Sequence, residues 1–356
     1  MNPRSFIAIL AIALLSSCSA EVREQLAPTP VAFGPINQLV VVADNTDWQG
    51  ALKDSFEYYF SSAYPVLPQP ESIFDLRYFS PEDLMAMDER RRLRCYIFLA
   101  DMADADSPTT KLVKEHLGEE KIRGSIAEKG FTASVAKDKW AEGQFLVYMT
   151  GEGEEKLIEN IQTNFRGVVN KIRENDKGKV SAQVYQAGVN EKLKDDLKLK
   201  MGVSLKVPAD YFMAMFDEDR KTLWIRKETD NLSSNIMFRK IPYESQEQFN
   251  KDNVVQMMDS LGRYVSSEIP NTFMVINDRD LPVLVEPMTL NNYFALEARG
   301  IWEMENDFMG GPFVSYLLHN PNEKELLFVD GFIHAPGEKK REFMQQLEHV
   351  IHTVTF

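Results

Sequence analysis

The chain has 356 residues and a formal net charge of −14, with 44% hydrophobic and 26% charged residues. These proportions are typical of a globular protein, and the length suffices for one large or two modest domains. The acidic balance argues against nucleic acid or anionic lipid as a partner, because phosphate groups are bound through Lys and Arg. We therefore expect no nucleic-acid partner.

Residues 1–17 have the parts of a bacterial lipoprotein signal peptide. Arg4 supplies positive charge, and the apolar run from Phe6 to Leu15 is too short to span a bilayer. Two serines then precede Cys18, as a signal peptidase requires. We expect lipid on Cys18 to anchor the mature chain to a membrane. An ordinary secretory signal with an incidental cysteine is the alternative.

Residues 18–36 are predicted to be a tether, because Pro28, Pro30 and Pro35 keep such a segment extended. The remainder is expected to divide into three parts. These are an N-terminal α/β unit at 37–175, a helical linker at 176–200 and a C-terminal β-rich α+β unit at 201–356.

The N-terminal unit is predicted to alternate strands with helices. Strands are expected at 39–42, 74–79, 95–100 and 144–149, and helices at 47–60, from Ser80 onward, at 110–117 and at 154–172. Ser80 can cap its helix, since Pro81 and two acids follow in the first turn. The charged segment 174–179, which contains Gly178, is predicted to end the unit.

The C-terminal unit is predicted to be richer in strands. After a lysine-rich helix at 191–200, strands are expected at 222–227, 236–241, 273–276, 283–285 and 293–304. A hairpin of 313–319 with 326–335 is expected to follow, and helices at 246–265 and 338–350. The fold class is α+β, with two mixed or antiparallel sheet units packed with helices. A divergent internal duplication is possible, since strands leading to Gly151 and Gly337 each precede an apolar-faced helix; coincidence is its rival.

Standard catalytic signatures are absent from the sequence: it has no phosphate-binding loop, dinucleotide glycine pattern, His-Glu-x-x-His, Cys-x-x-Cys or Gly-x-Ser-x-Gly. Cys95 lies in an apolar run and is interpreted as a core residue rather than a nucleophile. Asp101, Asp104 and Asp106 lack the spacing of an EF-hand, so a loop with Ser107 as a helix cap is favoured over a Ca²⁺ site.

The histidines do not predict a metal site. His349 and His352 are three residues apart and could share a ligand face with Glu348, but no third ligand can be placed. A helix end, where His is favourable near the negative dipole, is the preferred interpretation. His319 and His334 should lie near opposite ends of the hairpin. No metal and no cofactor are therefore expected.

The most unusual segment runs from Arg299 to Phe313 and contains a Gly-Gly-Pro turn. One hypothesis makes it a pocket rim on which Arg299, Trp302, Glu303 and Asp307 contact a ligand, since function concentrates on loops held by rigid strands. The alternative is a structural corner in which Arg299 pairs with Glu303 or Asp307. These two acids would also be the candidates for an acid/base pair if the protein were an enzyme.

Several strings together resemble the Bacteroidota lipoprotein family defined by domain of unknown function 4837. The matching strings lie at 67–71 with 74–75, at 202–205 with Pro208, at 223–229, at 299–315 and at 329–332 with Ala335 and Pro336. The resemblance implies a Gram-negative envelope lipoprotein. It implies no activity and carries no catalytic residue.

These observations predict an outer-membrane-anchored lipoprotein that acts by binding or assembly rather than catalysis. The periplasmic face is favoured over the cell surface. The expected partners are the membrane, through lipid on Cys18, and an envelope protein or glycan. The alternatives are a glycan or small-ligand binding module, and an envelope hydrolase with an unrecognised acid/base pair.

Overall fold

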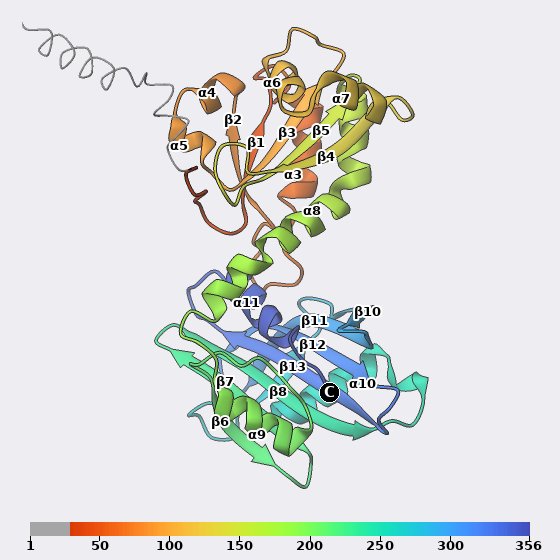
Figure 1. Ribbon diagram of the computed structural model, residues 1–356. Coiled ribbons are helices and arrows are strands. Elements are labelled where there is room, and N and C mark those ends of the chain that lie inside the picture. Colours follow the sequence, from red (N-terminus) through yellow and green to blue (C-terminus); the bar gives the residue numbers. More distant parts are fainter. Residues whose placement is uncertain (1–28) are drawn as a thin grey trace, which may run out of the picture. The chain divides into compact units, whose positions relative to one another are not determined.

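The computed structural model describes residues 29–356, which divide into two compact units (Figure 1). The first comprises the described residues up to Leu52 together with Arg77–Asn160, and the second comprises Lys53–Leu76 together with Ile161–Phe356. These bounds differ from the expected ones, because 53–76 and the residues from 161 onward join the second unit. The predicted signal peptide, Cys18 and the tether up to residue 28 lie outside the described residues.

The first unit is built on a five-stranded sheet in the order β2-β1-β3-β5-β4. The strands are β1 (Gln38–Val42), β2 (Asp75–Phe79), β3 (Cys95–Asp101), β4 (Phe131–Lys137) and β5 (Phe145–Gly151). β1, β3 and β5 run parallel, and β4 is antiparallel to β5. Covered parallel strands form continuous apolar runs, which is why these three are predictable. The edge strand β4 has no such run and is missed.

Helices of the first unit complete its core. They are α3 (Gly50–Phe60), which continues into the second unit, α4 (Pro81–Met85), α5 (Asp88–Arg91), α6 (Pro108–Leu117) and α7 (Glu119–Ile126). Leu84, Val113 and Ile122, from α4, α6 and α7, pack against Phe98 and Tyr148 of the sheet. The unit is thus held by one face of its central strands pressed against three helices.

Two helix starts confirm the predicted caps. Ser80 Oγ accepts from the Asp83 backbone N–H at 3.1 Å, and Ser107 Oγ accepts from Thr110 N–H at 3.0 Å. Asp104 accepts from the Ser107 N–H at 3.2 Å. This acid therefore shapes the loop before α6, in line with the interpretation favoured over a Ca²⁺ site.

The second unit is built on an eight-stranded antiparallel sheet in the order β10-β11-β12-β13-β8-β7-β6, with β9 also paired to β11. The strands are β6 (Phe212–Asp217), β7 (Thr222–Thr229), β8 (Leu232–Pro242), β9 (Phe273–Asn277), β10 (Leu284–Leu290), β11 (Tyr293–Glu305), β12 (Gly310–His319) and β13 (Glu325–His334). The predicted hairpin is β12–β13, in which His319 pairs with Leu326. The edge strand β6 was not predicted.

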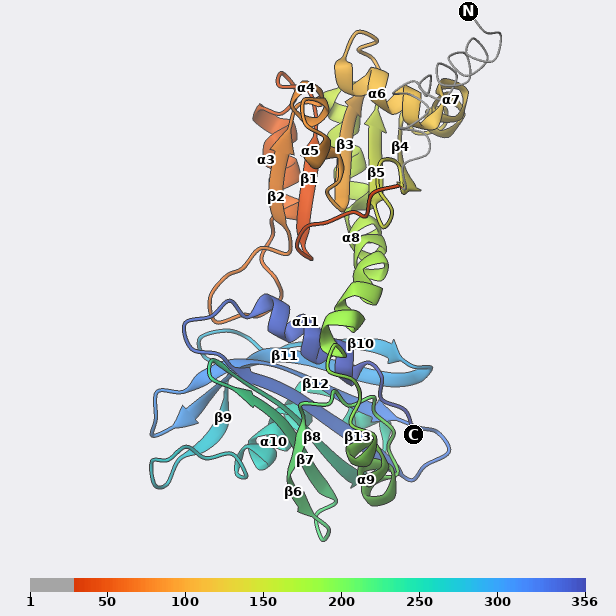
Figure 2. The same ribbon diagram turned by 60° about the vertical axis from the view of Figure 1, so that its left-hand side comes forward.

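Two helices cover the two faces of this sheet (Figure 2). Helix α10 (Lys251–Gly262), preceded by the short turn η1 (Gln246–Gln248), packs Met258 into a cluster with Phe332. Helix α11 (Arg341–Ile351) lies on the other face, where it contacts Gly331. Gly331 and Phe332 are neighbours on β13, and neighbouring strand residues point to opposite faces of a sheet. A Cβ at Gly331 would be 2.5 Å from Ile351 Cδ1, so glycine permits the close approach of α11.

Helix α8 (Glu154–Val184) is longer than predicted, and α9 (Glu191–Met201) confirms the predicted lysine-rich helix. The expected end of α8 before 174–179 is wrong. Its Glu, Lys and Arg residues favour helices, and Gly178 costs only about 1 kcal/mol there. No helix between residues 29 and 356 is long and apolar enough to cross a membrane.

The internal duplication is not confirmed. The first sheet has a parallel centre, whereas the pairs of the second are antiparallel, and the two strand orders differ. A strand followed by an apolar-faced helix recurs in unrelated α+β proteins, which is sufficient to explain the shared pattern around Gly151 and Gly337.

Candidate functional site

Arg299, a predicted ligand contact, lies on β11 with its guanidinium held by acids of the second unit. It donates to both carboxylate oxygens of Glu348 at 2.7 and 2.8 Å, and to Glu297 at 2.7 and 3.0 Å. The expected pairing with Glu303 or Asp307 is wrong. Glu297 shares the face of Arg299 at two residues' distance, whereas Glu303 lies about 13 Å away along the strand.

Trp302 is a core residue rather than part of a pocket rim. It is only 3% exposed, its indole N–H donates to the Ile333 carbonyl at 3.2 Å, and its ring meets that of Phe332 edge-on at 5.7 Å. Gly311 makes this packing possible, since a Cβ there would lie 2.0 Å from the Ile333 carbonyl oxygen. Close backbone approach therefore explains the glycine in the Gly-Gly-Pro segment.

Glu303 and Asp307 hold local structure near the β11–β12 turn. Glu303 accepts from Arg279 at 2.7 Å and from Asn277 at 2.9 Å. Asp307 accepts from the backbone N–H of Phe308 at 2.7 Å. These partners differ from those of Arg299 and Trp302, so the four predicted contacts do not form one cluster.

His349 of α11 and His352, the residue that follows the helix, both have aromatic neighbours. His352 Nε2 lies 2.9 Å from the Tyr316 hydroxyl, and the His349 ring lies 6.0 Å from that of Tyr185. Burial lowers the pKa of both imidazoles. Within residues 29–356, no group of three or more His, Cys, Asp and Glu side chains could hold a metal ion.

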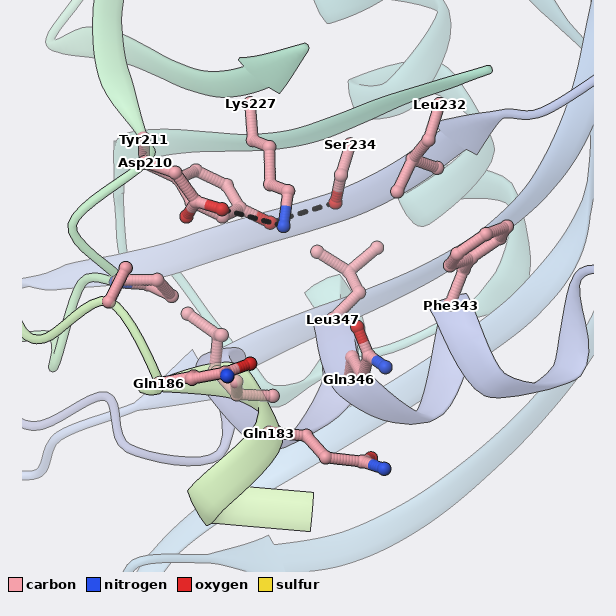
Figure 3. Close-up of a pocket in the computed structure, with 14 residues that line it drawn as sticks. Gln183, Gln186, Asp210, Tyr211, Lys227, Leu232, Ser234, Phe343, Gln346 and Leu347 are labelled. Carbon is pink, nitrogen blue, oxygen red and sulfur yellow. Dashed lines mark hydrogen bonds and ion pairs between the residues drawn. The ribbon is translucent and has the colours of Figure 1, made fainter. Parts of the chain in front are cut away.

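The second unit contains a cavity of about 420 Å³ that the sequence did not indicate (Figure 3). Its walls come from the end of α8, the loops at 186–187 and 208–211, strands β7 and β8, and helix α11. The lining residues are Gln183, Val184, Gln186, Ala187, Pro208, Asp210, Tyr211, Lys227, Leu232, Ser234, Phe343, Gln346, Leu347 and Val350. A volume in this range is typical of sites that bind small molecules.

One side of the cavity carries two polar pairs. Lys227 Nζ lies 2.7 Å from Asp210 Oδ2, and the hydroxyls of Tyr211 and Ser234 are hydrogen-bonded at 2.8 Å. Tyr211 is buried, and its burial raises the pKa of the phenol, which therefore stays neutral. The charges of Lys227 and Asp210 balance, so the lining as a whole presents no net charge.

The other side of the cavity combines amides with apolar surface. Gln183, Gln186 and Gln346 lie across the cavity from Lys227 and Tyr211 (Figure 3). Each amide offers two donors and one acceptor oxygen. Phe343 and Leu347 add ring and aliphatic surface beside them. The cavity can therefore bind a neutral ligand that has both hydroxyl groups and apolar faces.

Sequence reasoning missed this site because its residues come from separate segments. One feature of the sequence points to the cavity. Pro208 ends the stretch after α9 and is followed by Asp210 and Tyr211, a short loop held between a helix and a strand. Loops positioned by rigid elements are favoured places for binding residues.

Two family models match the chain, and they meet between α8 and α9. Residues 190–353 match the family described as Domain of unknown function (DUF4837), which confirms the inferred resemblance to this domain for these residues. Residues 32–185, which include the strings at 67–75, match Domain of unknown function (DUF8532).

No curated protein matches the chain. Among solved structures, the chain is similar to LpqN, described as involved in cell envelope biogenesis of Mycobacterium tuberculosis. The identity is 10%, the match covers 43% of this chain and 82% of that chain, and the TM-score is 0.26. A likeness at this TM-score carries no argument about fold or function.

Proposed function

We propose that this chain is an outer-membrane-anchored lipoprotein whose second unit binds a small neutral glycan fragment in the cavity beside α11. It acts as a binding or assembly factor of the envelope rather than as a catalyst. The observation that carries the proposal is the cavity of about 420 Å³, lined by two polar pairs, three amides and apolar surface.

The lining favours a saccharide over a charged ligand. Lys227 Nζ lies 2.7 Å from Asp210 Oδ2 and the other lining residues are neutral, so the lining carries no net charge that would attract a charged ligand. A sugar offers hydroxyl groups to the amides of Gln183 and Gln346, and a C–H face to the ring of Phe343.

The proposal of a lipid anchor at Cys18 is supported by the sequence. The signal-like segment 1–17 and the serines before Cys18 favour lipidation, and the prolines that follow favour an extended tether. Ser19, rather than Asp, follows Cys18, so retention at the inner membrane is not indicated, and the family resemblance favours the outer membrane, with the periplasmic face as the proposed side.

The test is calorimetric titration of the full chain with maltose, cellobiose and diacetylchitobiose, with glucuronic acid as the charged comparison. We expect at least one neutral disaccharide to bind and Gln346→Ala to weaken it about fivefold to tenfold, the loss of roughly one hydrogen bond. Gln162→Ala is the matched control, because Gln162 is exposed on α8 and does not line the cavity. Tighter binding of glucuronic acid than of every neutral sugar would contradict the proposal.

A further inference from the structure

Helix α11 has two roles in the second unit. Phe343, Gln346, Leu347 and Val350 line the cavity. Other residues of the same helix contact segment 61–75, which we call the strap. The strap is a loop that leads into Asp75, the first residue of β2, and it closes on itself where Tyr64 N–H donates to the Glu71 carbonyl at 2.7 Å. It therefore touches the helix that forms one wall of the proposed ligand site.

The strap caps the start of α11. The Glu71 carboxylate accepts from the backbone N–H groups of Lys340 at 2.5 Å and Arg341 at 3.3 Å. Lys340, at the N-cap position, makes no side-chain cap of its own. A carboxylate at a helix N-terminus satisfies open N–H groups and complements the helix dipole. The buried Arg341 guanidinium then donates back to the Ser72 carbonyl at 2.6 Å and to Asp75 at 2.7 Å.

The strap also holds α11 near its end. The Tyr64 hydroxyl donates to Glu348 at 2.7 Å, and Arg299 of the sheet binds both oxygens of the same carboxylate. Burial acts to raise the pKa of Glu348, but the Arg299 charge and the hydrogen bonds of Arg299 and Tyr64 lower it to about 2. Glu348 is therefore ionised at neutral pH and joins strap, helix and sheet.

We propose that the strap positions α11 as a wall of the cavity, and that Glu71 and Glu348 are positioning residues for ligand binding. The contacts hold the helix at its start and near its end, and the cavity-lining residues Phe343, Gln346 and Leu347 lie between them. A rigid supporting shell is what keeps a binding wall in place. The effect on affinity rests on the proposed function, whereas the effect on α11 itself does not.

Hydrogen–deuterium exchange of the full chain tests the hold on α11 without a ligand. In Glu71→Ala we expect the amides of the first turns of α11 to exchange about tenfold faster, the loss of one helix cap. Glu348→Gln should act on the last turns, and Glu71→Ala serves if that variant does not fold. The matched control is Gln69→Ala, an exposed strap residue, which should leave exchange unchanged. Unchanged exchange in Glu71→Ala would overturn the proposal.

Titration with the neutral disaccharide that binds best gives the second readout. We expect the dissociation constant to rise at least fivefold in Glu71→Ala and to recover in part in Glu71→Gln, which keeps an acceptor oxygen. Faster exchange with unchanged affinity would overturn the positioning role. If the unmodified chain binds no sugar, the proposed function fails, while the exchange result still decides whether the strap holds α11.

Discussion

Asp330 is a carboxylic acid enclosed in the core of the second unit. It lies on β13 opposite Ser315 of β12, whose hydroxyl donates to Oδ1 at 2.9 Å. Oδ2 has no hydrogen-bond partner among the described residues. Burial raises the pKa of Asp330 to about 7. An ionised carboxylate in this position would be poorly compensated, so the folded protein favours the protonated acid.

Stability should therefore fall as the pH rises from about 4 to 7. Asp330 is ionised above about pH 4 in the unfolded chain but only above about pH 7 in the folded protein, so folding holds one extra proton in this window. The decline is on the order of 4 kcal/mol in total and levels off above pH 7. Urea unfolding at pH 5, 6, 7 and 8 measures it. Asp330→Asn should lack this part of the slope, and equal slopes in both proteins would contradict the prediction.

At the scale of elements, close approach of helix to sheet depends on small residues. Gly331 allows α11 to lie against β13, with Ile351 Cδ1 and Leu347 nearest to the missing Cβ. We expect Gly331→Ala to lower the free energy of unfolding by about 1–3 kcal/mol through overpacking.

The overpacking has a direct test in a second substitution. Ile351→Val removes the Cδ1 atom that the new Cβ would meet at 2.5 Å, so it should recover part of the loss in the double variant. Gly124→Ala in α7 is the matched control, because a Cβ there meets nothing within 4 Å; it should stabilise by up to about 1 kcal/mol. Strictly additive effects of the two substitutions would argue against the contact.

Elements with a strong local sequence signal could be predicted, whereas elements that depend on tertiary contacts could not. The apolar runs of β3 and β5 and the cap at Ser80 are local signals, and they placed those elements correctly. Edge strands β4 and β6 alternate partly exposed residues, and tertiary pairing rather than local pattern makes them strands. The cavity and the strap depend on contacts between distant segments, which one sequence does not reveal.

At the scale of the whole molecule, the lipid proposed on Cys18 would hold the chain at a membrane. We expect Cys18→Ala to move the protein from the membrane fraction to the soluble fraction, because the acyl chains proposed on Cys18 would be its anchor. Detergent partitioning and mass spectrometry of the first tryptic peptide measure this change. Retention of the variant in the membrane fraction would contradict the predicted anchor.

The contacts of the strap must form late in the synthesis of the chain. Tyr64 precedes its partner Glu348 by 284 residues, so it leaves the ribosome long before α11 has been made. The contacts between the strap and α11 can form only after the end of the chain has been made, and contacts this distant in sequence form slowly. A chain truncated before residue 340 would leave Tyr64 and Glu71 without these partners. Proteases would then meet a second unit whose strap lacks its contacts with α11, so the end of the chain protects its middle from degradation.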